Sequence, residues 1–191
     1  MQKKLNFNLS HYIVMGTLFL VLIVYPILTL FLFNKIDSRI NSFETFWLQK
    51  NNIDYVYKVP EPYRDIFVYV CNKTKTPYDI VFNLIQLESG WNPKALSREN
   101  YDGSRDYGLM QINSTNFKYA ETIVFKALGV KYNPYEPYHS MLVGCTLLGE
   151  LYKEFKNWEN ALQAYNCGST AIYLNRVPEQ SKKYSSIILN K

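Results

Sequence analysis

The sequence predicts an α+β domain that is mainly helical, carries a small β-hairpin and follows one N-terminal transmembrane helix. An uncharged apolar run near the N-terminus indicates the transmembrane helix. Over most of the chain after residue 63, apolar residues recur at helical spacing. A polar stretch containing Asp102 and Gly103 interrupts this pattern, and an Asp-Gly pair suits a tight hairpin turn. The length of 191 residues fits one domain plus an appendage.

The N-terminal appendage is predicted to be a membrane anchor. Tyr12–Phe33 is an uncharged run of about 22 residues, or ~33 Å as a helix, which is enough to cross a bilayer core. Lys3 and Lys4 precede the run and indicate that residues 1–11 are cytoplasmic. A cleaved signal peptide is the competing interpretation, but it would be shorter and would need small residues that Phe31–Lys35 does not supply. The length and the flanks favour an uncleaved, single-pass anchor.

Residues 34–54 are predicted to form a stalk or linker between the anchor and a folded domain over residues 55–191. Apolar residues at 36, 40, 43 and 47 lie on one helical stripe, so this segment continues the helix. The pair Asn51-Asn52 ends it. Tyr55–Pro62 is expected to be an extended lead-in, because residues before proline avoid the helical conformation.

A buried central helix is predicted between Thr76 and Ser89. Thr76 is expected to cap this helix, with Pro77 in its first turn. Apolar residues surround the helix axis, which is typical of a core helix. Gly90 follows at a position where a left-handed residue commonly ends a helix. Glu88 is therefore expected at the C-terminal end of a core helix, where its side chain can enter a cleft.

The remaining elements follow from turn signals and apolar spacing. A short β-hairpin is expected between Ala95 and Tyr107, turning at Asp102-Gly103. Asn157 is predicted to cap a helix that carries apolar residues from Trp158 onward. Further helices are expected where apolar residues recur at helical spacing: Asn116–Leu128, Met141–Phe155 and Ser181–Leu189.

Composition and charge exclude several classes of function. The formal net charge is +5 and no run of Lys or Arg is present, so no nucleic-acid partner is predicted. Cys71, Cys145 and Cys167 lack the spacing of metal ligands, and His11 and His139 are isolated, so neither a metal nor another cofactor is predicted. An exported domain would allow a Cys145–Cys167 disulfide; a buried, inert thiol at Cys145 is the alternative.

Two carboxylates are the candidates for acid–base chemistry. Glu88 closes the apolar run Ile80–Leu87, and such surroundings raise the pKa of a carboxyl group because they disfavour its charged form. Asp106 follows in the hairpin region, which gives the paired carboxylates that glycosidic-bond cleavage requires. A hairpin aspartate that bonds local backbone amides is an equally weighted interpretation of Asp106. Asp102, in the turn itself, is predicted to be structural.

Three segments in order, Glu88–Ser97, Gly108–Gln111 and Ala164–Gly168, resemble the signature segments of the soluble-lytic-transglycosylase (SLT) family of peptidoglycan-cleaving enzymes. Asp102–Ser114 also resembles the β-hairpin of animal c-type lysozymes, and that of the transglycosylases that accompany bacterial secretion machines. The similarity covers roughly residues 55–190. It implies a lysozyme-like fold.

The resemblance also implies residue roles. In SLT-like enzymes one glutamate, here Glu88, protonates the leaving oxygen. It then acts as base on the muramoyl 6-hydroxyl, which gives a 1,6-anhydro product without water. Asp106 stands where c-type lysozymes keep their second carboxylate, which implies a retaining hydrolase as the alternative. The resemblance places further residues at the glycan: Ser97, Met110, Gln111, Tyr165, Asn166 and Tyr184.

The sequence therefore predicts a peptidoglycan lytic transglycosylase anchored in the bacterial cytoplasmic membrane, with its catalytic domain on the periplasmic side. The expected partners are peptidoglycan glycan strands, the membrane and a secretion or other envelope apparatus. A hydrolytic muramidase that uses Glu88 and Asp106 is the first alternative. An inactive glycan-binding scaffold of an envelope machine is the second, and the intact Glu88 and Gln111 count against it.

Overall fold

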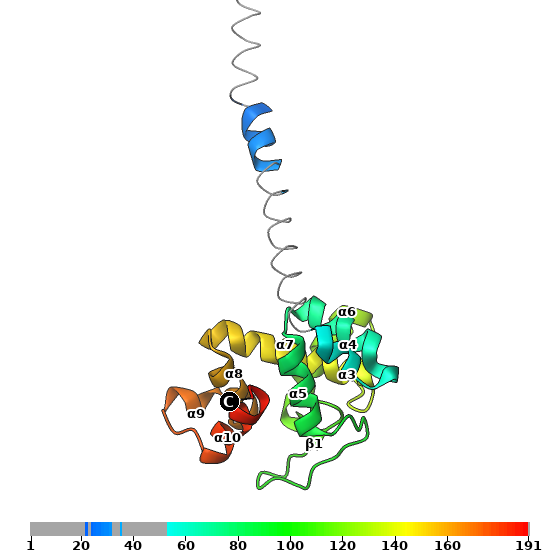
Figure 1. Ribbon diagram of the computed structural model, residues 1–191, viewed down its shortest axis with the longest axis vertical. Coiled ribbons are helices and arrows are strands. Elements are labelled where there is room, and N and C mark those ends of the chain that lie inside the picture. The colour runs from blue at the N-terminus through cyan, green and yellow to red at the C-terminus, as the bar shows by residue number, and fades with distance from the viewer. Residues whose placement is uncertain (1–21, 23, 32–34, 36–52, 191) are drawn as a thin grey trace, which may run out of the picture. The chain divides into compact units, whose positions relative to one another are not determined.

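The computed structural model describes residues 22, 24–31, 35 and 53–190 (Figure 1). The chain divides into two compact units, residues 1–47 and 48–191. Residues 25–31 of the first unit are helical. In the part of the chain described, no helix is both long and apolar enough to cross a membrane. Most of the predicted anchor and stalk lies outside the described residues, so the anchor remains a prediction.

The first described residues of the second unit are helical, where an extended lead-in was predicted. Ile53–Lys58 forms helix α3, and the 3-10 helix η2, Glu61–Tyr63, follows. The prediction was wrong because the constraint of the proline at 60 acts only on Val59, after α3 has ended. The Arg64 side chain donates to the carbonyl oxygens of Val56 and Val59 at 3.2 and 3.3 Å. It thus supplies hydrogen-bond donors to carbonyl groups at the C-terminal end of α3 that have no partner within the helix.

Helices α4, Arg64–Thr74, and α5, Tyr78–Glu88, come next. Thr76 does not cap α5: Pro77 occupies the cap position, and the Thr76 hydroxyl pairs with Thr74 at 2.9 Å. The inner residues of α5 are fully buried, although Leu87 is 42% exposed, so the helix is not enclosed on every side. Gly90 ends the helix as predicted, with φ of +57°.

A two-stranded antiparallel sheet follows α5. Strand β1, Asp106–Tyr107, pairs with β2, Ile112–Asn113, so that Asp106 lies opposite Asn113. The turn predicted at Asp102-Gly103 forms, but only an isolated bridge between Leu96 and Tyr107 flanks it. The ladder itself closes through the later turn at residues 108–111. The hairpin was therefore predicted correctly in kind but several residues too early.

The other described elements of the unit are helices. Asn157 caps α8 by accepting a hydrogen bond from the backbone N–H of Asn160, as predicted. Helix α9 was not predicted. In Figure 1, α8, α9 and α10 lie on one side of α5, while α3, α4 and α6 lie on the other. The elements after β2 are η3 Ser114–Asn116, α6 Phe117–Leu128, α7 Pro137–Phe155, α8 Trp158–Cys167, α9 Ser169–Tyr173 and α10 Glu179–Ile188.

The cysteines are free, which corrects the disulfide alternative. Helices α7, which carries Cys145, and α8, which carries Cys167, pack together. The thiol of Cys145, however, is buried against the Met110 sulfur at 3.9 Å. The Cys167 thiol donates to the carbonyl oxygen of Gln163 in the preceding turn of its own helix. Cys145 is therefore the buried thiol of the other interpretation.

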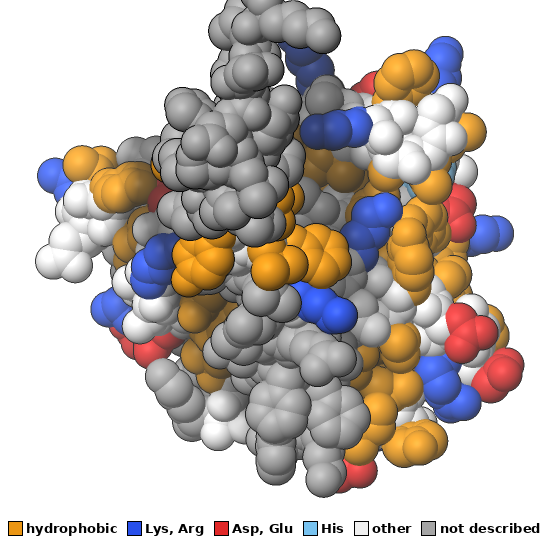
Figure 2. Space-filling model, turned by 90° about the horizontal axis from the view of Figure 1, so that it is seen from above, with side chains coloured by type: hydrophobic (Ala, Val, Ile, Leu, Met, Phe, Trp, Pro, Cys, Tyr) orange, Lys and Arg blue, Asp and Glu red, His pale blue; other side chains and the backbone are white. Residues whose placement is uncertain are grey.

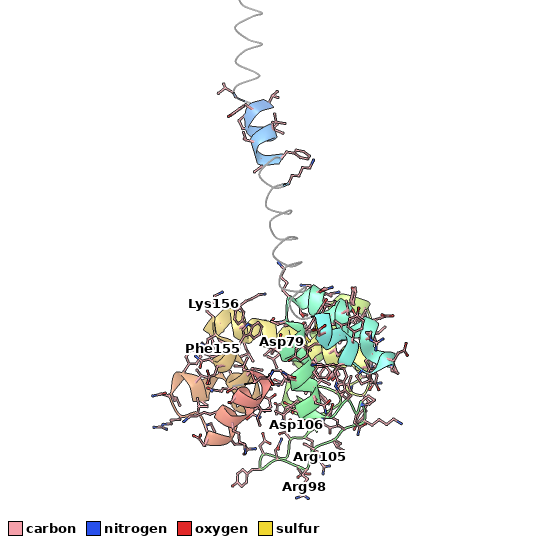
Figure 3. All side chains as sticks on the ribbon, viewed as in Figure 1. Asp79, Arg98, Arg105, Asp106, Phe155 and Lys156 are labelled. Atoms are coloured by element: carbon pink, nitrogen blue, oxygen red, sulfur yellow. The ribbon has the colours of Figure 1, made fainter. Side chains whose placement is uncertain are left out.

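On the face shown in Figure 2, basic and acidic side chains of the described residues are interspersed. This face offers mixed charge rather than a uniformly basic field. Figure 3 places Arg98, Arg105 and Asp106 at the hairpin end of the domain. Arg105 is paired there with Glu99 at 3.1 Å, so part of the basic charge at this end is compensated.

Candidate active site

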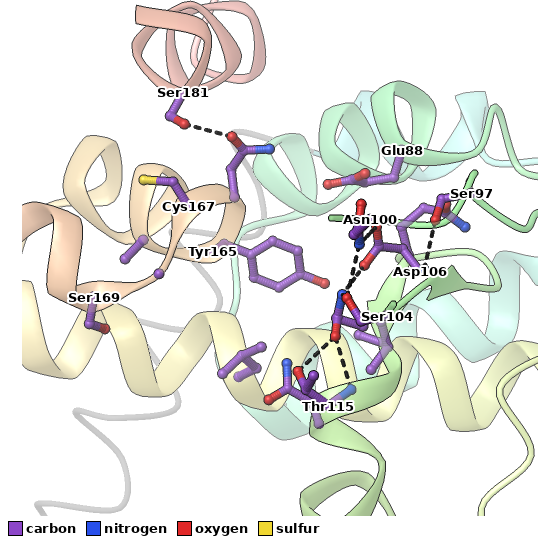
Figure 4. Close-up of a pocket in the computed structure, with 18 of the residues that line it drawn as sticks. Glu88, Ser97, Asn100, Ser104, Asp106, Thr115, Tyr165, Cys167, Ser169 and Ser181 are labelled. Atoms are coloured by element: carbon purple, nitrogen blue, oxygen red, sulfur yellow. Dashed lines mark hydrogen bonds between the residues drawn. The ribbon is translucent and has the colours of Figure 1, made fainter. Parts of the chain in front are cut away.

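A cavity of about 1020 Å³ lies between the hairpin region and the helices α7, α8 and α10 (Figure 4). Glu88 enters it from the end of α5. The hairpin region contributes mostly amide, hydroxyl and carboxylate side chains, which suit a ligand rich in hydroxyl and amide groups. The lining residues from that region are Ser97, Asn100, Tyr101, Asp102, Ser104, Asp106, Gln111, Ile112 and Asn113.

Glu88 has the perturbed acidity that was predicted for it. Burial is the main cause and raises its pKa from 4.5 to about 7, with a further increase from the charge of Asp106. A hydrogen bond from Tyr184 acts in the opposite direction. The Tyr184 hydroxyl donates to Glu88 Oε1 at 2.5 Å, so Oε2 is the oxygen left to carry an acidic proton. At near-neutral pH a large share of Glu88 is therefore protonated.

The end of α5 is tied to the segment that follows β1. Ser89 Oγ donates to the carbonyl oxygen of Leu109 at 2.8 Å. The next carbonyl, that of Met110, accepts a hydrogen bond from the Tyr165 hydroxyl at 2.9 Å. Burial raises the pKa of Tyr165 well above its ordinary value, and the charge of Glu88 adds to this. Tyr165 therefore stays neutral and presents its ring to the cavity near Glu88 (Figure 4).

Asp106 lies in the same cavity, on strand β1. Its Oδ1 accepts a hydrogen bond from Asn113 Nδ2 at 2.8 Å, and its Oδ2 accepts a longer one from Asn100 Nδ2 at 3.4 Å. The carboxylate thus bonds side-chain amides rather than the local backbone amides of the structural interpretation. The backbone N–H of Asp106 donates to Ser97 Oγ at 2.9 Å. The geometry brings Asp106 and Glu88 to one cavity, and the role of Asp106 stays a prediction.

A hydrogen-bonded group around Ser104 was not predicted from the sequence. Ser104 Oγ accepts from Asn100 Nδ2 and Asn113 Nδ2 and donates to Asp102 Oδ1. Asp102 is structural, as predicted, and its bonds to Ser104 lower its pKa. The available signal was the set of amide and hydroxyl residues on both sides of Asp106. These residues become neighbours only when the hairpin register is known.

Two of the other predicted glycan-contacting residues lie away from the cavity surface. The side chain of Met110 is fully buried, with its sulfur next to Gly144 and Cys145 in the core. The structure therefore places its backbone carbonyl, rather than its side chain, at the site. Tyr184 is also buried and meets the site through Glu88.

The remaining predicted residues line the cavity. Gln111 Nε2 donates to the carbonyl oxygens of Gly108 and Ala95 at 2.9 and 3.3 Å, which holds the turn between β1 and β2. Asn166 Oδ1 accepts from Ser181 Oγ at 2.7 Å, which joins α8 to α10. Ser97 lies beside Asp106. Among the described residues, no group of His, Cys, Asp and Glu side chains is arranged to hold a metal ion.

The family model described as "Transglycosylase SLT domain" matches residues 67–188. The chain therefore belongs to the transglycosylase SLT domain family. The matched span contains Glu88, Asp106, Tyr165 and Tyr184. The family predicted from the sequence is confirmed.

Curated relatives include the protein named "Invasion protein IagB" from Salmonella typhimurium and Salmonella typhi. Each is 36% identical over 95 residues, which covers 48% of this chain and 55% of the relative. The chain thus spans about half the length of these relatives in the aligned region.

Solved structures show the same fold. The 70 kDa soluble lytic transglycosylase SLT70 from Escherichia coli aligns with a TM-score of 0.57 and 20% identity, over 74% of this chain and 24% of that one. An inactive mutant of the lytic transglycosylase Slt from Pseudomonas aeruginosa aligns with a TM-score of 0.55 and 17% identity, over 68% of this chain and 23% of that one. The predicted fold, mainly helical and lysozyme-like with a small antiparallel hairpin, is confirmed.

Proposed function

We propose that this chain is a peptidoglycan lytic transglycosylase in which Glu88 acts first as acid and then as base. The observation that carries the proposal is a glutamate with a pKa raised to about 7 at the wall of a large polar cavity, within the segment that matches the SLT family. The solved relatives of the same fold are named as lytic transglycosylases, which supports this choice of reaction.

In the first step, the protonated carboxyl of Glu88 gives its proton to the oxygen of the MurNAc-GlcNAc β-1,4 bond, and that bond breaks. In the second step, the Glu88 carboxylate removes the proton from the muramoyl 6-hydroxyl. The freed oxygen closes onto the anomeric carbon and forms the 1,6-anhydro ring. The proton is back on Glu88 and no water is consumed.

The surroundings of Glu88 suit both steps. Burial favours the protonated carboxyl that the first step needs. The hydrogen bond that Tyr184 donates to Oε1 favours the carboxylate that the second step needs. Because these effects oppose each other, the pKa lies near neutral pH, where one group can serve efficiently as acid and as base.

The test is to incubate the purified full-length chain with peptidoglycan sacculi and to identify the released muropeptides by mass. We expect 1,6-anhydro ends from the wild type and none from Glu88→Gln. Glu179→Gln is the matched control, because Glu179 lies on the surface of α10, with its side chain 87% exposed, and should leave the product unchanged. Release of reducing ends alone would contradict the proposal. Glycan binding without turnover by the wild type would instead support the scaffold alternative.

A hydrolytic muramidase is the second candidate, and the placement of Asp106 in the cavity with Glu88 favours it. A retaining hydrolase uses its second carboxylate as a nucleophile or charge stabiliser and water as the final acceptor. Reducing ends in place of 1,6-anhydro ends, together with loss of most activity in Asp106→Asn, would establish this reaction.

We also propose that Tyr12–Phe33 anchors the chain in the cytoplasmic membrane with the SLT domain on the periplasmic side. The support is the length and uncharged character of that run. The chain should stay in membranes washed with carbonate at high pH, and protease added to spheroplasts should digest the domain. Release by carbonate, or a domain protected from protease, would contradict this arrangement.

A partner in an envelope machine is the remaining proposal. The support is the name of the curated relatives, "Invasion protein", together with the predicted periplasmic position of the domain. Crosslinking in intact cells followed by purification of the full-length chain should recover components of a secretion or other envelope apparatus. Recovery of peptidoglycan alone would contradict such a partnership.

A further inference from the structure

Tyr101 stands at the cavity with no structural reason for its aromatic ring. Its relative exposure is 110%, the highest of the large apolar side chains described, and yet it is one of the residues that line the cavity. Among the described residues, Tyr101 makes no hydrogen bond and no ring contact. The ring therefore contributes nothing to packing, although an exposed aromatic side chain at a cavity is a common feature of binding sites.

The backbone that carries Tyr101 is held by hydrogen bonds on both sides. Asn100 N–H donates to the Ser104 carbonyl oxygen at 2.8 Å, and Gly103 N–H donates to the Asn100 carbonyl oxygen at 3.0 Å. Asp102 Oδ1 accepts from both the backbone N–H and the hydroxyl of Ser104. Asn100 also reaches Asp106 through its side chain. The ring is thus exposed on a turn whose position is tied to the candidate catalytic carboxylate.

The composition of the cavity indicates what the ring would contact. Of the residues that line it, only Tyr101 and Tyr165 are aromatic. Tyr165 is half-buried, and its hydroxyl is bonded to the Met110 carbonyl oxygen. Tyr101 is the aromatic face available at the exposed hairpin side. A pyranose ring presents C–H groups that pack on such a face, while its hydroxyl and acetamido groups face the amides and hydroxyls nearby.

We propose that Tyr101 is a stacking platform for a sugar ring of the glycan strand. It lies at the hairpin edge of the cavity and contacts a sugar that does not take part in the bond that is cleaved. This inference rests on the proposed function, because it takes a glycan as the ligand. The fixed turn presents the ring before the ligand arrives, so little ordering of the backbone opposes binding.

The test measures binding of purified, uncrosslinked glycan strands to the full-length chain by calorimetry. All proteins carry Glu88→Gln, so that the strands stay intact during the titration. Tyr101→Ala should weaken binding by about three- to tenfold, the range expected for one aromatic contact. Tyr101→Phe and Tyr101→Trp should keep the affinity, while Tyr101→Leu should lose it, because stacking requires a flat ring.

Tyr57→Ala is the matched control. Tyr57 is also an exposed tyrosine, at 72%, but it lies on α3 and does not line the cavity. The Tyr57→Ala variant should bind glycan strands with the affinity of its parent. The melting temperature of Tyr101→Ala should equal that of its parent, because the Tyr101 ring does not pack against other side chains. Equal affinities of Tyr101→Ala and its parent would overturn the stacking role alone. Absence of both glycan binding and glycan turnover in the chain with native Tyr101 and Glu88 would overturn the proposed function as well.

Discussion

The two walls of the cavity hold the same functional group in different surroundings. The helical wall presents Glu88 beside the half-buried Tyr165 and the buried Tyr184, and burial raises the pKa of Glu88 to about 7. The hairpin wall presents Asp106, whose oxygens accept hydrogen bonds from the amides of Asn113 and Asn100. The environment of a carboxyl group, and not its residue type, therefore decides which of the two can act as the acid.

The difference has its origin in the secondary structure. The last turn of α5 carries Glu88 against core residues, where a single donor, Tyr184, does not compensate for the loss of solvent. The short hairpin places alternate side chains toward the cavity, so Asp106 has polar neighbours from the facing strand. The charge of Asp106 then raises the pKa of Glu88 further.

The largest expected effect is on activity, from removing the acid of the helical wall. Glu88→Gln keeps the shape of the side chain but cannot transfer a proton. We expect the rate of muropeptide release to fall by about a thousandfold or more, as is typical when a general acid–base group is lost. Quantitative chromatography of the products measures this. A residual rate within tenfold of the wild type would remove Glu88 from the mechanism.

The next effect is on stability, from a substitution that destabilises the hairpin wall and leaves both carboxylates in place. Gly108 has φ of +75°, and a Cβ atom there would lie 2.0 Å from the carbonyl oxygen of Pro134. Gly108→Ala should therefore lower the free energy of unfolding by about 3 kcal/mol, from the strained φ and the clash together.

Gly103→Ala is the control for that substitution. Gly103 has a similar φ of +79°, but nothing lies within 4 Å of a Cβ atom at this position. It should cost only about 1 kcal/mol, from the strained φ alone. Urea denaturation of both variants separates the two contributions, and equal losses would show that the clash with Pro134 is absent.

An effect of similar size concerns the pH dependence of stability, and it arises on the helical wall. Because folding raises the pKa of Glu88 from 4.5 to about 7, ionisation of the unfolded chain costs native stability progressively as the pH rises between these two values, and the full cost is present above pH 7. The cost disappears below the ordinary pKa, where the group is protonated in both the folded and the unfolded chain. Glu88→Gln should thus stabilise the chain by on the order of 3 kcal/mol at pH 8.5, from a pKa difference of about 2.5 at ~1.36 kcal/mol per pH unit, and by nothing at pH 4.

Thermal unfolding of wild type, Glu88→Gln and the surface control Glu179→Gln across this pH range measures that difference. The control should follow the wild type at every pH. If Glu88→Gln were instead less stable than the wild type at pH 8.5, Glu88 would be an ionised residue satisfied by its neighbours. The surroundings of Glu88 on the helical wall would then not raise its pKa.

The smallest expected effect is the loss of rate in Asp106→Asn, which distinguishes transglycosylation from hydrolysis. Asp106→Asn removes the charge from the hairpin wall but keeps a side chain that can bond Asn113. A transglycosylase that uses Glu88 alone should lose less than about tenfold in rate, which is about 1.4 kcal/mol in the barrier. A loss as large as that from Glu88→Gln, measured in the same product assay, would indicate the hydrolytic mechanism.

The helical wall was largely predictable from the sequence, because its determinants are local. The apolar run before Glu88 and the glycine at 90 predicted both the helix end and the raised pKa. The cap at Asn157 was also predicted correctly. The start of the same helix was not, since Thr76 bonds Thr74 instead of capping, and nothing in the local pattern distinguishes these two uses of a hydroxyl.

The hairpin wall was less predictable, because its determinants depend on register. The turn at Asp102-Gly103 was visible, but the ladder forms through a second turn in which Gln111 takes φ of +47°. The bonds from Asn113 and Asn100 to Asp106 follow from that register. The burial of Met110 against α7 depends on packing between distant segments, which apolar spacing does not specify.

The role of Glu88 as the general acid is tested most simply by measuring its pKa. Carbon NMR of the full-length chain, with glutamate side-chain carboxyls labelled with 13C, follows every glutamate through a pH titration, and Glu88→Gln assigns the signal by its loss. We expect this one carboxyl to titrate near pH 7 and Asp106→Asn to shift its titration to lower pH. If the signal titrates near the ordinary value of 4.5, Glu88 is ionised at neutral pH and cannot be the general acid.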